Sequence, residues 1–273
     1  MTTAFVLPGG ASLGAVQVGM ADALIEAGIQ PDLIVGTSAG ALNGAWLAAR
    51  PGPDGIAELR ELWLKVRRRE IFPFSPLKIM LGLFGRRDHL VSAKRLTAWL
   101  AVRAPLSRLE QARVPLHVMT TDLATGAAVM LSSGDAIDAL LASAAIPGIY
   151  PPVQIGGRLL VDGGLAADTP ITQAVQLGAD IVYVLPTVGI QAGARPTRAP
   201  AIALQALAHL LGHASDNEIA ANADRCTLYV IPALPTRDIS PFDFTHGREL
   251  IDAALVSTRA WLTTAQPVGA VLT

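Results

Sequence analysis

The chain has 273 residues, 51% of them hydrophobic and 16% charged, a composition typical of one compact domain over residues 1–273 and not of a disordered or fibrous chain. Its net charge of −1 argues against nucleic acid as a partner. The single cysteine, Cys226, excludes an internal disulfide and fits a reducing compartment.

The start of the chain predicts a cytoplasmic location. Residues 1–10 contain no basic stretch and only a short apolar run before Pro8, which is too short for the core of a signal peptide. Further along, Gly, Pro or charged residues interrupt every apolar run before it reaches the ~18 residues that a membrane-spanning helix needs. Peripheral contact with a membrane is the closest association that we expect.

Short apolar runs alternate with helical patterns along the chain, and Gly28 is placed to end the first helix. The predicted strands cover residues 4–7, 32–36, 115–123, 127–132, two runs within 151–162, 180–186 and 227–232, and the predicted helices cover 14–28, 39–50, 54–69, 92–103, 135–144, 170–177, a stretch within 201–223 and 246–264. This alternation predicts an α/β fold with a mainly parallel sheet covered on both faces.

Residues 72–87 mix proline, glycine and large apolar side chains without clean periodicity. We predict that they form a flap that meets a lipid surface, with Arg86 and Arg87 beside anionic head groups. The alternative is that these apolar side chains fill the core of the domain.

The stretch "GTSAG" at residues 36–40 places Ser38 between two glycines at the end of a predicted strand and the start of a predicted helix. A sharp strand-to-helix turn projects such a serine above the edge of the sheet, beside the unpaired N–H groups of the helix. This arrangement is typical of a nucleophilic serine. The alternative is that Ser38 only caps the helix.

The glycine loop "GGASLG" at residues 9–14 follows the first predicted strand. Its backbone N–H groups are suited to stabilising an oxyanion. The alternative is a cradle for the phosphates of a nucleotide, but Ala11 departs from the G-x-G-x-x-G spacing and no acidic residue ends the second strand.

A nucleophilic serine also needs a base. None of the five histidines has a local signature: His89, His117, His209, His213 and His246. Asp162, by contrast, ends an apolar run and enters a glycine turn in "LLVDGG". Asp162 is therefore the candidate base, and the alternative is that it only supports the Asp-Gly turn.

Together these motifs resemble the patatin-like phospholipases, which combine a glycine loop, G-x-S-x-G and a distant D-G-G; residues 9–14, 36–40 and 162–164 match them. "TDLATG" at 121–126 and "SAAIPGIYPPV" at 143–153 extend the resemblance, which covers about residues 4–185. It implies a three-layer α/β/α sandwich and a Ser-Asp dyad, in which Ser38 attacks an acyl ester and Asp162 accepts its proton without a histidine. The remaining residues that the resemblance assigns to the site are the oxyanion donors Gly9, Gly10 and Ala11 and the supporting glycines Gly14, Gly36, Gly40, Gly163 and Gly164.

The resemblance implies hydrolysis of phospholipids, lysophospholipids or other fatty-acyl esters, with no metal and no cofactor. Two residues of the glycine loop depart from the family pattern: Ala11 replaces a frequent glycine, and Leu13 replaces a frequent basic residue. The loss of the basic side chain leaves the preferred head group open. An acyltransferase, an inactive lipid-binding or interaction protein and a nucleotide-binding module stay as alternatives, and the acyl length and oligomeric state are undefined by the sequence.

Overall fold

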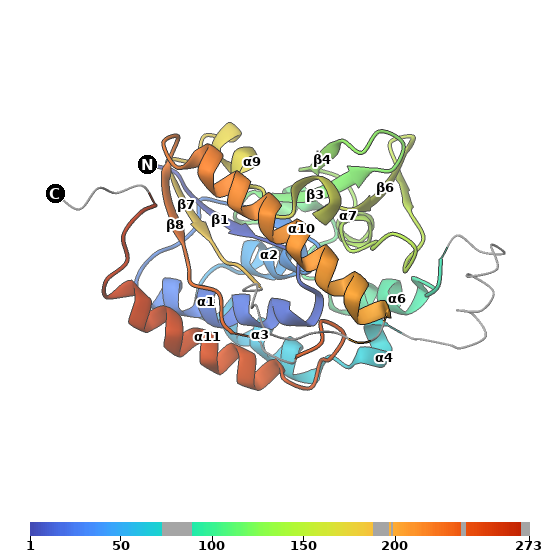
Figure 1. Cartoon of the computed structure of the whole chain (residues 1–273), viewed down its shortest axis with the longest axis horizontal. Helices are drawn as coiled ribbons and strands as arrows, with labels where there is room; N and C mark the ends of the chain where they lie inside the picture. The colour runs from blue at the N-terminus through green and yellow to red at the C-terminus, as the bar shows by residue number, and fades with distance from the viewer. Residues whose placement is uncertain (73–88, 188–196, 198, 236–238, 269–273) are drawn as a thin grey trace.

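A mixed sheet of eight strands forms the centre of the computed structural model, which describes residues 1–72, 89–187, 197, 199–235 and 239–268 (Figure 1). The strand order is β5-β6-β3-β2-β1-β7-β8, and β4 pairs with β3. The strands are β1 (Thr3–Leu7), β2 (Leu33–Thr37), β3 (Leu116–Asp122), β4 (Ala128–Leu131), β5 (Val153–Ile155), β6 (Arg158–Asp162), β7 (Ile181–Val184) and β8 (Thr227–Val230). All eight predicted strands are confirmed, each within a few residues.

The sheet has a parallel and an antiparallel part. Strands β3, β2, β1, β7 and β8 are parallel neighbours, whereas β4 and β6 pair antiparallel with β3, and β5 pairs antiparallel with β6. The prediction of a mainly parallel sheet is thus confirmed for the five strands of the α/β core. The connections from β3 to β4 and from β5 to β6 are too short for a crossover helix, so these consecutive strands pair antiparallel.

Helices cover both faces of the sheet. They are α1 (Ala15–Glu26), α2 (Ala39–Ala49), α3 (Pro53–Lys65), α4 (Arg68–Ile71), α6 (Lys94–Arg103), α7 (Ala136–Ser143), α8 (Gly164–Ala167), α9 (Ile171–Gln176), α10 (Ala199–Asn222) and α11 (Gly247–Leu262), with 3-10 turns at Ala11–Gly14 and Leu109–Gln111. The predicted helices are confirmed, except that residues 54–69 divide into α3 and α4. The short α8, which directly follows Asp162, was not predicted.

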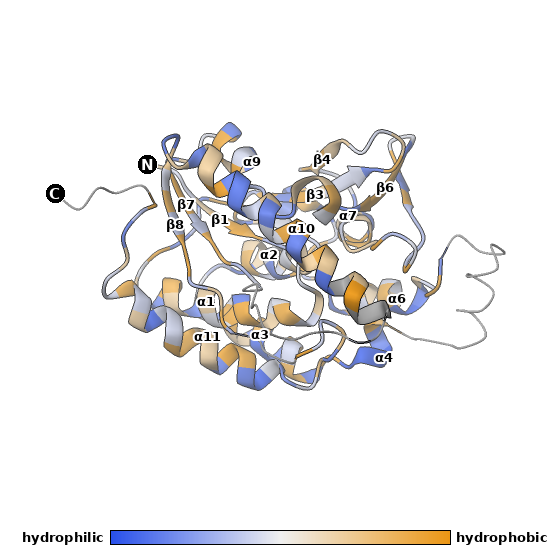
Figure 2. Cartoon of the chain, viewed as in Figure 1, coloured by the Kyte–Doolittle hydropathy of each residue, from blue (hydrophilic) through white to orange (hydrophobic). Residues whose placement is uncertain are grey.

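Two hydrophobic cores show why the fold has three layers. Along β1, Phe5 and Leu7 point into one core, while Ala4 and Val6 point into the other. The first core also contains side chains of α1, α2, α3 and α11, and the second contains side chains of α8 and α9. Because successive strand residues point to opposite faces, an apolar run such as β1 needs cover on both sides. Figure 2 shows the difference: β1 is largely orange, whereas blue and orange alternate along the half-exposed α11.

The predicted flap lies outside the described residues except for its first residue. Phe72 is buried, and its ring lies 5.1 Å from that of Phe242 and 5.6 Å from that of Tyr150, measured between centroids. Phe72 therefore belongs to the packed interior, as the alternative expects for this one side chain.

Candidate active site

The register of the sheet brings the ends of β2 and β6 together. Thr37, the last residue of β2, pairs with Met119, and Asp162, the last residue of β6, pairs with the next residue, Thr120. Strand β4 occupies the other edge of β3 at both positions. Strands β2 and β6 therefore follow one another along a single edge of β3 and run toward each other, so that Ser38 and Asp162 meet.

Ser38 and Asp162 form a buried hydrogen bond. The Ser38 hydroxyl donates to Asp162 Oδ2 over 2.7 Å, and the two residues are 9% and 7% exposed. Ser38 holds the N-cap position of α2, but its side chain makes no capping bond, so the alternative that it only caps the helix is wrong. Asp162 Oδ1 accepts the N–H of Gly164 at 2.8 Å. This carboxylate thus supports its glycine turn and binds the serine at the same time.

The backbone of Ser38 is strained. Among the described residues other than glycine, only Ala11 and Ser38 have a positive φ, of 49° and 53°. The Ser38 N–H donates to the Ser143 hydroxyl at 2.8 Å, and that hydroxyl donates to the carbonyl oxygen of Met119 at 2.7 Å. Strain of this kind gathers at functional sites, where the surrounding structure enforces it. Here Ser143, an unpredicted member of the site, ties the turn to β3.

The motif glycines allow the chain to pass close to itself around Ser38. A Cβ on Gly40 would collide with the carbonyl oxygen of Leu7, and a Cβ on Gly36 would lie 2.7 Å from Ala41 Cα. A Cβ on Gly163 would collide with the carbonyl oxygen of Met119. Real side chains are not found at such separations, so these glycines set the approach of α2 to β1 and of the Asp162 turn to β3.

Two buried amide side chains hold the glycine loop at both ends. Gln17 donates to the carbonyl oxygen of Pro8 at 2.8 Å, and Asn43 donates to that of Gly14 at 2.9 Å. Asn43 also donates to Gln17 Oε1 and accepts the indole N–H of Trp63, each at 2.8 Å. Because these polar groups satisfy one another away from water, the network fixes the loop before any ligand binds.

The three predicted oxyanion donors differ in their surroundings. The Gly9 N–H donates to Asp168 Oδ1 over 3.3 Å, and the Gly9 carbonyl accepts the Thr187 hydroxyl. In the described part of the chain, the N–H groups of Gly10 and Ala11 donate to no other protein group, and both residues line a cleft with Ser38. Their role as donors to an oxyanion stays a prediction.

Two neighbouring carboxyl groups titrate abnormally at the site. Burial raises the pKa of Asp162 to about 6. Burial and the negative charge of Asp162 together raise the pKa of Asp168 to about 7. A Cβ on Gly164 would lie 3.2 Å from Asp162 Oδ1 and 3.3 Å from Asp168 Oδ1, so both carboxyl groups border the same small space. Asp168 is not among the predicted site residues. The only sequence feature that points to it is its position six residues after Asp162.

Among the described residues, two cavities contain Ser38, and none of the five histidines lines either of them. His117 is half-buried and shares a hydrogen bond with the Ser132 hydroxyl at 2.7 Å, and desolvation lowers its pKa. His246 lies at the start of α11, 3.0 Å from Glu249, whose hydrogen bond raises its pKa. Asp162 is therefore the titratable side chain in contact with the serine hydroxyl.

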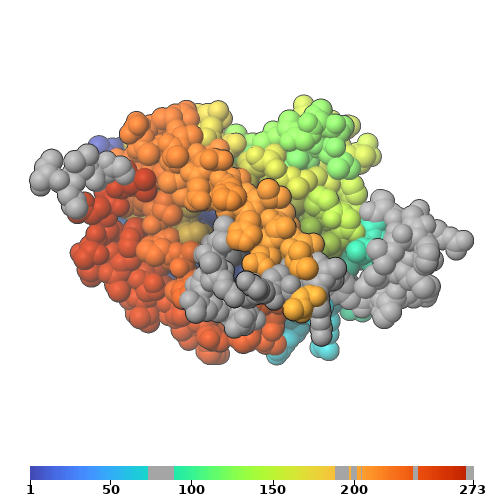
Figure 3. Space-filling model, in the orientation of Figure 1, coloured from blue at the N-terminus to red at the C-terminus, as the bar shows by residue number. Residues whose placement is uncertain are grey.

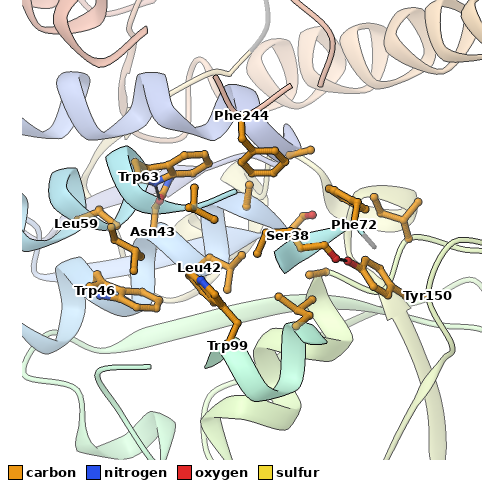
Figure 4. A pocket seen from close by; sticks show the side chains of 18 residues that line it. Ser38, Leu42, Asn43, Trp46, Leu59, Trp63, Phe72, Trp99, Tyr150 and Phe244 are labelled. Atoms are coloured by element: carbon orange, nitrogen blue, oxygen red, sulfur yellow. Dashed lines mark hydrogen bonds between the residues drawn. The ribbon is translucent and has the colours of Figure 1, made fainter. Parts of the chain in front are cut away.

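Two cavities meet at Ser38. One is an open cleft of about 310 Å³ between the glycine loop, Asp162, Asp168 and the side chains of Leu207 and Leu211 on α10. In Figure 3, α10 extends across the front of the molecule in orange. The other cavity is an apolar pocket that extends along α2 (Figure 4). A molecule whose reacting atom lies at Ser38 can therefore place one part in each cavity.

Within the described residues, no three His, Cys, Asp or Glu side chains gather closely enough to hold a metal ion. In the same part of the chain, every helix is too short or too polar to cross a bilayer.

The fold and the bonded serine and carboxylate place the chain among the α/β proteins that carry a G-x-S-x-G turn between a strand and a helix. More narrowly, it belongs to the patatin-like phospholipase family, whose model matches residues 5–175. The match contains the three motifs on which the resemblance rests, and the predicted family is thereby confirmed.

Relatives cover different shares of the chain. An NTE family protein of Mycobacterium tuberculosis is 30% identical over 191 residues, which are 70% of this chain and 50% of that protein. Lysophospholipase nte1 of Aspergillus oryzae is 29% identical over 180 residues, 66% of this chain and 11% of the relative. The chain thus spans about half the length of the mycobacterial protein and about a tenth of the fungal one. Among solved structures, VipD from Legionella pneumophila matches the fold with a TM-score of 0.50 at 16% identity, covering 96% of this chain and 67% of VipD.

Proposed function

We propose that the chain is a serine hydrolase that cleaves the acyl esters of lipids, with Ser38 as nucleophile and Asp162 as base. The observation that carries the proposal is the 2.7 Å hydrogen bond from the Ser38 hydroxyl to Asp162 Oδ2, at the junction of an apolar pocket and an open cleft. Membership of the patatin-like phospholipase family and similarity to a fungal lysophospholipase support a lipid substrate.

In the first half of the reaction, Ser38 Oγ attacks the ester carbonyl carbon while Asp162 takes its proton. As a result, the carbonyl oxygen becomes negatively charged. It accepts hydrogen bonds from the N–H groups of Gly10 and Ala11 and lies near the N-terminus of α2, whose dipole favours the negative charge. The tetrahedral intermediate then collapses, and the alcohol leaves with the proton from Asp162. This leaves an acyl group on Ser38.

The second half repeats the same proton transfers with water. Asp162 takes a proton from a water molecule as its oxygen attacks the acyl carbon, and returns it to Ser38 Oγ as the acid leaves. A carboxyl with a pKa of about 6 is mostly ionised at neutral pH and is a stronger base than an ordinary aspartate. Burial thus gives Asp162 the basicity that histidine supplies in other serine hydrolases.

Labelling with a fluorophosphonate probe tests the nucleophile directly. The wild-type chain should form a covalent adduct on the peptide that contains Ser38, as measured by mass spectrometry. Ser38→Ala should lose the label, while Ser92→Ala, which lies outside both cavities at Ser38, should keep it. A folded wild-type protein that stays unlabelled would contradict the proposal and favour a lipid-binding protein without activity.

A further inference from the structure

One face of α2 forms the floor of the apolar pocket over two helical turns. Starting from Ser38 at its N-terminus, the lining follows the helix through Leu42 to Trp46. In Figure 4, Ser38 lies between Trp46 and Leu59 on one side and Phe72 and Tyr150 on the other. One arm of the pocket therefore leads along α2 from the serine to Trp46.

The amide of Asn43, the hydroxyl of Tyr150 and the indole N–H of Trp63, which are polar groups among the lining side chains, already have partners. The Asn43 amide binds Gly14, Gln17 and Trp63, and the Tyr150 hydroxyl donates to the carbonyl oxygen of Ile71. Most of the other lining side chains are aliphatic or aromatic, and α3, α4 and α6 supply Leu59, Leu62, Ile71, Leu96 and Trp99 among them. A polar guest would lose its hydrogen bonds to water in this pocket and replace few of them, whereas an alkyl chain would lose none.

The far end of this arm is closed by aromatic packing. The rings of Trp46 and Trp99 lie 6.1 Å apart between centroids, and the two residues are 5% and 7% exposed. Leu59, which is 1% exposed, lies beside them. An extended guest that enters at Ser38 meets this barrier and cannot continue along the helix.

We infer that this pocket binds the acyl chain of the substrate and that Trp46 limits its length, so that the substrate class is esters of unbranched, medium-length acids. The inference rests on the proposed function, because it takes the acyl carbon to be bonded to Ser38. The alcohol part of the ester then lies in the cleft that Asp162, Asp168 and the side chains of α10 line.

The length of α2 between Ser38 and Trp46 sets the length of acyl chain that the pocket can hold. Trp46 follows Ser38 by eight residues, which at about 1.5 Å of rise per residue is about 12 Å along α2. Carbon–carbon bonds of about 1.5 Å at tetrahedral angles advance a chain by about 1.25 Å per carbon, so about eight to ten carbons fill this distance. Each methylene buried before the limit raises kcat/KM by up to about fourfold, and methylenes beyond it gain nothing.

The test measures kcat/KM of the full chain on p-nitrophenyl esters with unbranched acyl chains of about four to sixteen carbons, a series that brackets the length estimated from α2. For the wild type, we expect a rise up to about ten carbons and at least a tenfold drop by sixteen. Trp46→Leu should move the maximum to longer chains. Leu42→Trp, one turn from the serine, should move it to shorter ones.

Trp261→Leu is the matched control, because Trp261 lies on α11 and lines neither cavity at Ser38. Its profile should keep the wild-type maximum, and melting temperatures should show that all variants are folded. Opposite shifts in the two pocket variants support the inference. A maximum that stays in place in folded Trp46→Leu and Leu42→Trp overturns it, as does an equal shift in Trp261→Leu. Failure of the proposed function looks different, since no ester of any length would then be cleaved.

Discussion

The parallel and antiparallel parts of the sheet place the two central side chains of the site in different ways. Ser38 is set locally, by the end of β2, the start of α2 and the glycines at 36 and 40. Asp162 arrives 124 residues later from the antiparallel strand β6, and only the pairing of β6 with β3 brings it to the serine. A short motif thus fixes the nucleophile, whereas long-range register fixes the base.

The two parts also differ in what each adds to the chemistry. The parallel part contributes strained backbone and helix N-termini, at Ala11 and Ser38. The antiparallel part contributes a buried negative charge, at Asp162. Variants that affect one part at a time should therefore separate backbone geometry from proton transfer.

The largest effect is expected from replacing the base. Asp162→Asn keeps the size of the side chain but cannot accept the serine proton, so kcat on a short ester should fall by about 10²–10⁴. His117→Ala and His246→Ala should change kcat by less than about tenfold, since neither lines a cavity at Ser38. If either histidine variant lost as much activity as Asp162→Asn, a histidine would have to be the base.

The next largest effect concerns the local turn. Gly40→Ala places a methyl group against the carbonyl oxygen of Leu7, where the backbone leaves no room, and should cost about 3 kcal/mol or more of folding free energy. Thermal unfolding and kcat both report the change.

Gly28→Ala is the control for that substitution. Gly28 follows α1 with a φ of +78°, as its predicted place at the end of the helix requires, and a Cβ there would meet nothing within 4 Å. Its cost should be about 1 kcal/mol, from backbone strain alone, with kcat retained. Equal losses in the two variants would mean that close approach is not what Gly40 provides.

A third prediction concerns pH. Asp162 must be ionised to accept a proton, and burial raises its pKa to about 6. The kcat/KM for a neutral ester should therefore rise with pH between about 4 and 7, with a midpoint near 6, and then level off. An ascending limb near the ordinary aspartate pKa of about 4 would show that Asp162 is not the group that titrates.

The smallest effect is expected at the second carboxyl. The pKa of Asp168 is about 7 in the fold and near the ordinary value when unfolded, so the folded state binds the proton more tightly. Stability is therefore lost as the pH rises from about 4 to about 7. Asp168→Asn removes this loss, and its melting temperature should exceed that of the wild type by a few degrees at pH 8 and by less at pH 4. The same difference at both pH values would contradict a raised pKa.

The features that could be predicted from the sequence are those that depend on residues close together in the chain. The strands, the helices and the glycines around Ser38 follow from short patterns, because each depends on residues close in the chain. The direction of β6 does not, since an apolar run fits a parallel or an antiparallel pair equally well. The role of Asp168 does not follow from the sequence either, because only the folded chain brings its carboxylate to the N–H of Gly9. The pocket was missed because α2, α3 and α6 supply its tryptophans from separate segments.

Because Thr120 pairs with Asp162, the register of the hairpin between β5 and β6 determines whether the Asp162 carboxylate can reach Ser38. Antiparallel residues that point to the same face recur every second position, about 6.8 Å apart. A slip of β6 by two residues would keep its apolar side chains on their proper faces but carry the carboxylate beyond reach of the 2.7 Å bond to Ser38. Insertions at the Gly156-Gly157 turn are therefore harmless only if they leave this register unchanged.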